Sequence, residues 1–109
     1  MIYLKEEAKQ VEMLPGLVRR TLADGPEMML CEFSFESGVE IPTHTHPHEQ
    51  VGYVVRGEVR MTIGGQENLL GAGDSYYIPG NLPHSAYTLS PSLIIDCFTP
   101  PREDYRIQS

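Results

Sequence analysis

The segment Gly38-Val39-Glu40-Ile41-Pro42-Thr43-His44-Thr45-His46-Pro47-His48-Glu49-Gln50 holds three of the four histidines of this chain. Successive side chains of a strand point to opposite faces, so alternate residues share a face. On an extended chain His44 and His46 therefore converge, and Gln50 returns to their face while Glu49 points away. Imidazole nitrogens suit first-row transition metals, and an amide oxygen can complete the set. The segment predicts a metal site.

Two assignments within this segment stay open. Glu49 stands beside Gln50, and either side chain can supply the fourth ligand. His48 shares the formal parity of the other two histidines, but Pro47 disturbs the strand locally, so we expect His48 at the rim or behind the ligands. A lone His-x-His pair is also typical of a polar surface turn, so the surrounding sequence has to decide.

Alternating apolar and polar residues predict several short strands. Glycine- and proline-rich turns, including Gly64-Gly65 at a hairpin position, separate the apolar runs. Residues 4–14 suit either a helical turn or an N-terminal strand, and the residues from Pro100 onward suit an extended tail over the surface. Many short strands separated by such turns indicate a β-sandwich or barrel. The strand-like runs cover residues 29–35, 51–55, 59–63 and 93–98.

The composition fits one acidic globular domain. The chain has 109 residues, 40% hydrophobic and 21% charged, which is ordinary for a folded domain. Its net charge of −7 argues against nucleic-acid partners and against anionic membrane surfaces. Cys31 and Cys97 lie in apolar runs and are expected to be buried, reduced thiols. Neither a signal peptide nor an apolar run of membrane length is apparent, so we expect a cytoplasmic protein.

The spacing of glycine, proline and histidine resembles the two motifs of the cupin family. Residues 38–57 match the first motif and residues 73–88 match the second. The second motif usually has Gly where this chain has Asn81, and Asn tolerates the positive φ of such a turn. The resemblance implies an all-β cupin double-stranded β-helix, an RmlC-like jelly-roll barrel, as a single domain over residues 1–109. It also implies four metal ligands, namely His44, His46, Gln50 and His84.

The ligand at position 50 sets the charge of this implied site. The first cupin motif usually has Glu where this chain has Gln50. With four neutral ligands a divalent ion keeps its full charge, which makes it a stronger Lewis acid and less suited to stabilising a more oxidised metal. The donor types allow Ni, Zn, Mn, Fe, Co or Cu and do not single out one of them.

Asp96 interrupts the last apolar run and shares a face with Phe98. A carboxylate inside a barrel is costly unless it is paired or works near a metal, and the structural alternative is a strand-edge Asp96 paired with Arg102 or another arginine. The pattern Asp96-x-Phe98-x-x-x-Arg102 resembles small cupins related to the pectin-degradation protein KdgF, a likeness that runs over nearly the whole chain. One departure is the shorter spacing between His46 and Gln50.

This second resemblance implies an activity. It is a metal-dependent, isomerase-like enzyme that opens 4,5-unsaturated monouronates from pectin or alginate breakdown to their linear keto form. Asp96 would move protons, Arg102 would hold the sugar carboxylate, and Phe98 would pack against the ring. A cupin dioxygenase or oxidase, and a non-catalytic cupin that binds a small ligand, are the alternatives. The cupin resemblance further implies a homodimer.

Overall fold

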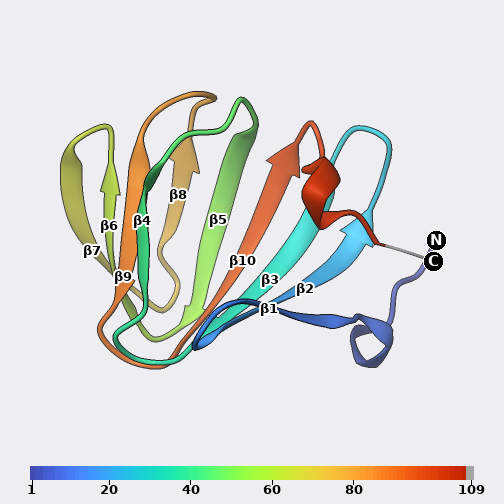
Figure 1. The fold of residues 1–109 in the computed structure, drawn as a ribbon, viewed down its shortest axis with the longest axis horizontal. Coiled ribbons are helices and arrows are strands. Elements are labelled where there is room, and N and C mark those ends of the chain that lie inside the picture. Colours follow the sequence, from blue (N-terminus) through green and yellow to red (C-terminus); the bar gives the residue numbers. More distant parts are fainter. Residues whose placement is uncertain (108–109) are drawn as a thin grey trace.

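Ten antiparallel strands in two sheets form the molecule, as Figure 1 shows. The computed structural model describes residues 1–107. Its strands are β1 (Gln10–Leu14), β2 (Leu17–Asp24), β3 (Met29–Phe35), β4 (Glu40–His44), β5 (Glu49–Arg56), β6 (Glu58–Ile63), β7 (Gln66–Gly71), β8 (Ser75–Ile78), β9 (His84–Thr88) and β10 (Ser92–Thr99). Two short 3-10 turns, η1 (Lys5–Glu7) and η2 (Glu103–Tyr105), lie near the ends. Within residues 1–107, no helix is long and apolar enough to cross a membrane.

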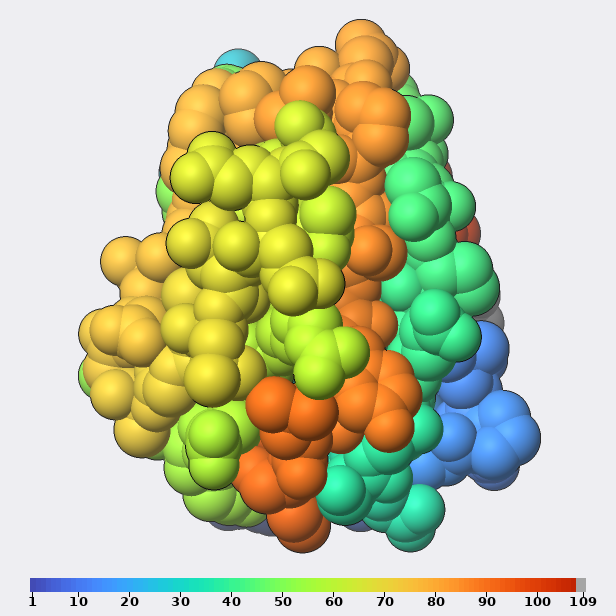
Figure 2. All heavy atoms as spheres, turned by 90° about the vertical axis from the view of Figure 1, so that its left-hand side faces the viewer, coloured from blue at the N-terminus to red at the C-terminus, as the bar shows by residue number. Residues whose placement is uncertain are grey.

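The strand order brings segments that are distant in sequence into contact. The larger sheet has the order β1-β2-β3-β10-β5-β8 and the smaller one β4-β9-β6-β7. Figure 2 looks onto the smaller sheet, where yellow residues of β7, orange residues of β9 and green residues of β4 form one face. Strands β4 and β9 therefore lie in one sheet, and β5, β8 and β10 in the other. This arrangement confirms the predicted all-β jelly-roll barrel.

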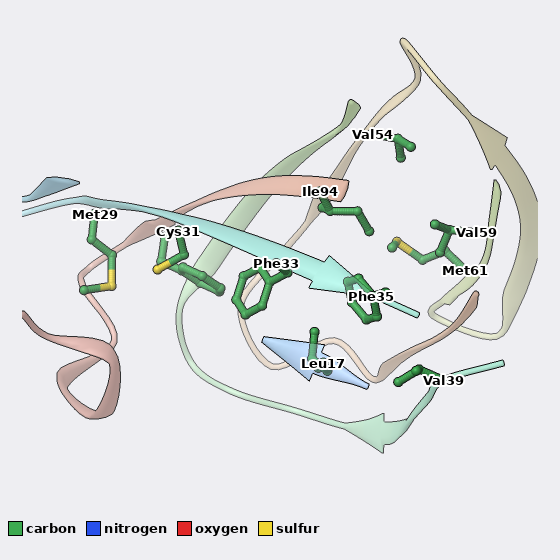
Figure 3. Packing of buried hydrophobic residues seen from close by; sticks show 11 residues of the cluster. Leu17, Met29, Cys31, Phe33, Phe35, Val39, Val54, Val59, Met61 and Ile94 are labelled. Carbon is green, nitrogen blue, oxygen red and sulfur yellow. The ribbon is translucent and has the colours of Figure 1, made fainter. Parts of the chain in front are cut away.

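A core of apolar side chains fills the space between the sheets (Figure 3). Strand β3 has the predicted bounds, and its alternate residues Met29, Cys31, Phe33 and Phe35 are all buried. Burying each such side chain contributes about 1.5–3 kcal/mol, so this face fixes the register of the strand. The other face of β3 is not fully solvated as alternation suggests, because Glu32 is buried there in ion pairs with Lys5 and Arg20.

Most turns follow the sequence prediction, and two details differ. Gly64 and Gly65 both have positive φ between β6 and β7, as a tight hairpin requires. Both cysteines are free, but Cys97 is only half-buried, because the outer side of β10 is partly open. The residues from Pro100 onward do not simply run over the surface. The η2 turn directs Tyr105 inward, where its ring meets Phe33 edge-on with 6.1 Å between centroids.

Candidate metal centre and cavity

Three histidine rings meet at one end of the barrel. His44 ends β4 and His84 begins β9, and the two residues are direct partners in the register of these strands. Their ring centroids are 4.2 Å apart, and the ring of His46 lies 4.8 Å from that of His84. The candidate ligand atoms of the three side chains all lie within 4.8 Å of one another.

His46 reaches this cluster from a turn and not from a strand. Strand β4 ends at His44, so strand parity alone does not bring the two rings together. The turn is held by the second motif, because the backbone N–H of Asn81 donates to the carbonyl of His46 at 2.8 Å. Asn81 has φ of 66°, the conformation expected for it. Its neighbour Gly80 packs so closely that an added Cβ would lie 2.4 Å from the Pro47 oxygen.

Each histidine is oriented by a backbone carbonyl two residues away. The Nδ1 atoms of His44, His46 and His84 lie 2.9, 3.1 and 2.8 Å from carbonyl oxygens. The accepting residues are Pro42, His48 and Leu82. A neutral imidazole that donates through Nδ1 carries its lone pair on Nε2, so this backbone contact selects the tautomer that can bind a metal.

Gln50 faces His46 and completes the donor set. Its Oε1 lies 3.0 Å from His46 Nε2, and both groups are buried. The amide oxygen and the Nε2 lone pair are both hydrogen-bond acceptors, so neither atom can donate a proton to the other. A cation bound by both atoms would stabilise this close contact. Glu49 points the other way, is exposed, and accepts a hydrogen bond from the Tyr77 hydroxyl. The structure therefore brings Gln50 and not Glu49 to the histidines, and this donor set fits a divalent transition metal.

The surroundings keep two of the histidines neutral. Burial and the neighbouring His84 and Arg102 lower the pKa of His46 to about 4. The pKa of His84 is also lowered, mainly by burial. Neutral imidazole is the form that binds metal, so these two residues are ready ligands at neutral pH. His48 contributes its carbonyl to His46, while its own ring stands 5.5 Å from that of His46.

Asp96 lies beside the cluster, deep in the barrel. It is 4% exposed and accepts a hydrogen bond from the Tyr76 hydroxyl. Burial raises its pKa to about 6, while hydrogen bonds from Tyr76 and Gln50 lower it in part. The alternative in which Asp96 pairs with Arg102 or another arginine is not found among residues 1–107, where Arg102 forms a salt bridge with Asp104.

Arg102 and Phe98 line the same cavity. The guanidinium carbon of Arg102 stands 5.6 Å from the centroid of the Phe98 ring and 4.2 Å from that of Tyr105. The Tyr105 carbonyl accepts a hydrogen bond of 2.6 Å from the hydroxyl of Thr21, which ties the tail to β2. The tail thus presents one guanidinium to the cavity on an aromatic support.

All of the predicted site residues line a single cavity of about 290 Å³. The four candidate ligands in its lining are His44, His46, Gln50 and His84. The C-terminal residues in its lining are Asp96, Phe98 and Arg102. The sequence did not single out Tyr76 or Tyr105 as lining residues. Adjacent residues of a strand point to opposite faces, but the sequence does not say whether Tyr76 or Tyr77 faces inward, and nothing in a charged tail indicates that Tyr105 lines a cavity.

Three known proteins are similar to this chain over nearly its whole length. The chain is 29% identical to the pectin degradation protein KdgF of Dickeya dadantii over 105 residues, covering 94% of this chain and 96% of the relative. The solved structure of KdgF from a Halomonas species superimposes with a TM-score of 0.92 at 32% identity, covering 97% of this chain and 98% of that one. An RmlC-like cupin from Shewanella frigidimarina superimposes with a TM-score of 0.92 at 34% identity, over 96% and 95%.

A family model for the cupin domain matches residues 31–96, which include both motifs and all four histidines. These residues run from within β3 to within β10 and carry the four candidate ligands together with Asp96. With the two-sheet barrel and the histidine cluster, this match shows that the chain belongs to the cupin family.

Proposed function

We propose that this cupin is a metal-dependent enzyme that opens and ketonises 4,5-unsaturated monouronates from pectin or alginate breakdown. One observation carries the proposal: a buried acid, a guanidinium and an aromatic ring line the same cavity as a complete set of metal donors. Similarity to KdgF proteins over nearly the whole chain supports it. A cavity of about 290 Å³ suits one sugar ring better than an oligosaccharide.

The proposed reaction is an isomerisation and needs no co-substrate. The bond between the ring oxygen and the anomeric carbon breaks, the anomeric hydroxyl loses its proton, and a proton is added at C4, so that a ketone forms at C5. Asp96 is the group placed to move these protons, because a carboxyl with a pKa of about 6 can both accept and donate near neutral pH.

Binding is assigned to the other cavity residues. Arg102 receives the sugar carboxylate as a bidentate pair, in competition with its contact to Asp104. Phe98 packs against the sugar ring and excludes water. His44, His46, His84 and Gln50 would hold the metal, which when bound supplies Lewis-acid polarisation of substrate oxygens.

Elemental analysis followed by an assay on unsaturated galacturonate tests this proposal. We expect a bound divalent metal and loss of the ultraviolet absorbance of the C4–C5 double bond. Asp96→Asn should abolish turnover and keep the metal, and Arg102→Lys should raise KM about tenfold or more, because lysine cannot form the bidentate pair. Turnover retained by Asp96→Asn would remove Asp96 from the mechanism. Metal binding without turnover by the unaltered protein would favour a ligand-binding cupin.

A further inference from the structure

A row of three residues crosses the larger sheet beside the metal centre. In the register of the strands, Gly52 of β5 lies directly opposite Tyr76 of β8 on one side and Asp96 of β10 on the other. A Cβ on Gly52 would lie 2.1 Å from Tyr76 Cζ and 2.3 Å from Asp96 Oδ1. The missing side chain therefore lets Tyr76 and Asp96 meet above the central strand, where the hydroxyl donates to the carboxylate.

Gln50 stands two residues before Gly52 on the same face of β5. Gln50, Tyr76 and Asp96 line the same cavity, and side-chain hydrogen bonding from Gln50 acts to lower the pKa of both Asp96 and Tyr76. Carboxylate oxygens only accept, and the Tyr76 proton is already given to Asp96, so the Gln50 –NH2 group supplies these bonds. The two ends of an amide differ, and fixing the nitrogen end fixes the oxygen end, which faces His46 Nε2 at 3.0 Å.

We propose that Tyr76, acting with Asp96 over Gly52, is a positioning residue that orients the Gln50 amide so that its oxygen is the metal ligand. The proposal rests on the metal-binding part of the proposed function and not on the substrate. It accounts for the Gln at this position: a Glu would have no proton to give Asp96, and two carboxylates would share one buried pocket. Tyr76 thereby affects the metal without touching it.

The metal affinity of single variants tests this orientation, with Co²⁺ as the probe. Tyr76→Phe keeps the ring and removes the hydroxyl, and we expect Co²⁺ affinity to fall about tenfold with a changed visible spectrum. Tyr77→Phe is the matched control, because the adjacent Tyr77 points outward to Glu49, and it should bind as the unaltered protein does. Gln50→Ala gives the effect of losing the ligand outright.

A second pair of variants separates orientation from packing. Asp96→Asn retains a carbonyl oxygen that can accept from Gln50, so Co²⁺ affinity should stay within about threefold of the starting value. Asp96→Leu has the same branched shape and no acceptor, although it is larger, and its Co²⁺ affinity should fall with that of Tyr76→Phe. Circular dichroism and Tm show that each variant is folded.

Equal Co²⁺ affinity and spectra in Tyr76→Phe and Tyr77→Phe would overturn the proposal, as would full affinity in Asp96→Leu or an unaltered protein that binds no Co²⁺. If the affinities change as expected but unsaturated uronates are not converted, the proposed function fails and the positioning role of Tyr76 stands.

Discussion

Asp96 is a buried acid that the folded protein protonates more readily than the unfolded chain does. Its pKa rises from 3.8 to about 6 on folding, chiefly through burial. The stability tied to its proton is complete below about pH 4 and is lost as the pH rises through 6, because the unfolded state releases the proton first. Because ionised Asp96 lowers the stability of the folded protein at neutral pH, its presence is better explained by chemistry in the cavity than by packing.

Asp96→Asn should therefore stabilise the metal-free protein at pH 8 by up to about 3 kcal/mol, since two pKa units correspond to about that free energy. At pH 4 the two proteins should differ little. Urea unfolding at both pH values measures this, with the exposed Glu58→Gln as a control that should follow the unaltered protein. An equal effect of Asp96→Asn at pH 4 and pH 8 would contradict the assigned cause.

At the scale of elements, the turn after β4 and the turn before β9 hold each other. The N–H of Asn81 bonds the carbonyl of His46, and Gly80 leaves no room for a side chain beside Pro47. The position of His46 thus depends on a residue far along the sequence, which no local pattern around the histidines reveals.

Gly80→Ala should separate these two turns, because its Cβ would approach a backbone oxygen that cannot swing aside. We expect a loss of about 2 kcal/mol or more in stability and a clear fall in metal affinity, both measurable by urea unfolding and Co²⁺ titration. Gly71→Ala is the control, since its nearest neighbour would be the Asp74 side chain at 4.0 Å. Comparable losses in both variants would show that Gly80 has no special contact.

Local periodicity predicted the elements well where one face is buried. The alternation in residues 29–35 gives β3 with its bounds, and parity correctly turned Gln50 inward and Glu49 outward on β5. His46 required the turn contact from motif two, and Tyr76 required the register across three strands, so neither followed from local sequence. The hydrogen bond between Tyr76 and Asp96 could not be predicted for the same reason, because the two residues are 20 positions apart in sequence.

At the scale of the whole molecule, the candidate metal ligands direct their lone pairs toward one another, and a bound cation would remove the repulsion between them. A metal at about 100 times its Kd should add about 2.7 kcal/mol of stability. For a domain of this size that raises Tm by roughly 10 °C. His84→Ala should lose most of this shift in a thermal scan with and without Co²⁺ or Zn²⁺, whereas His48→Ala should keep it, since alanine retains the backbone carbonyl that His48 presents to His46. A full shift in His84→Ala would exclude that residue as a ligand.

The tail that carries Arg102 and Tyr105 lies outside both sheets, although the metal donors lie on β4, β5, β9 and the turn between the first two. Arg19 and Arg102 both stack on the Tyr105 ring and Arg106 forms an ion pair with Asp24, so both an aromatic side chain and a salt bridge hold the tail. Under the proposed function, metal binding and carboxylate recognition would therefore reside in separable pieces of the chain. Exchanging this short segment would then change the anion accepted while leaving the metal donors in place.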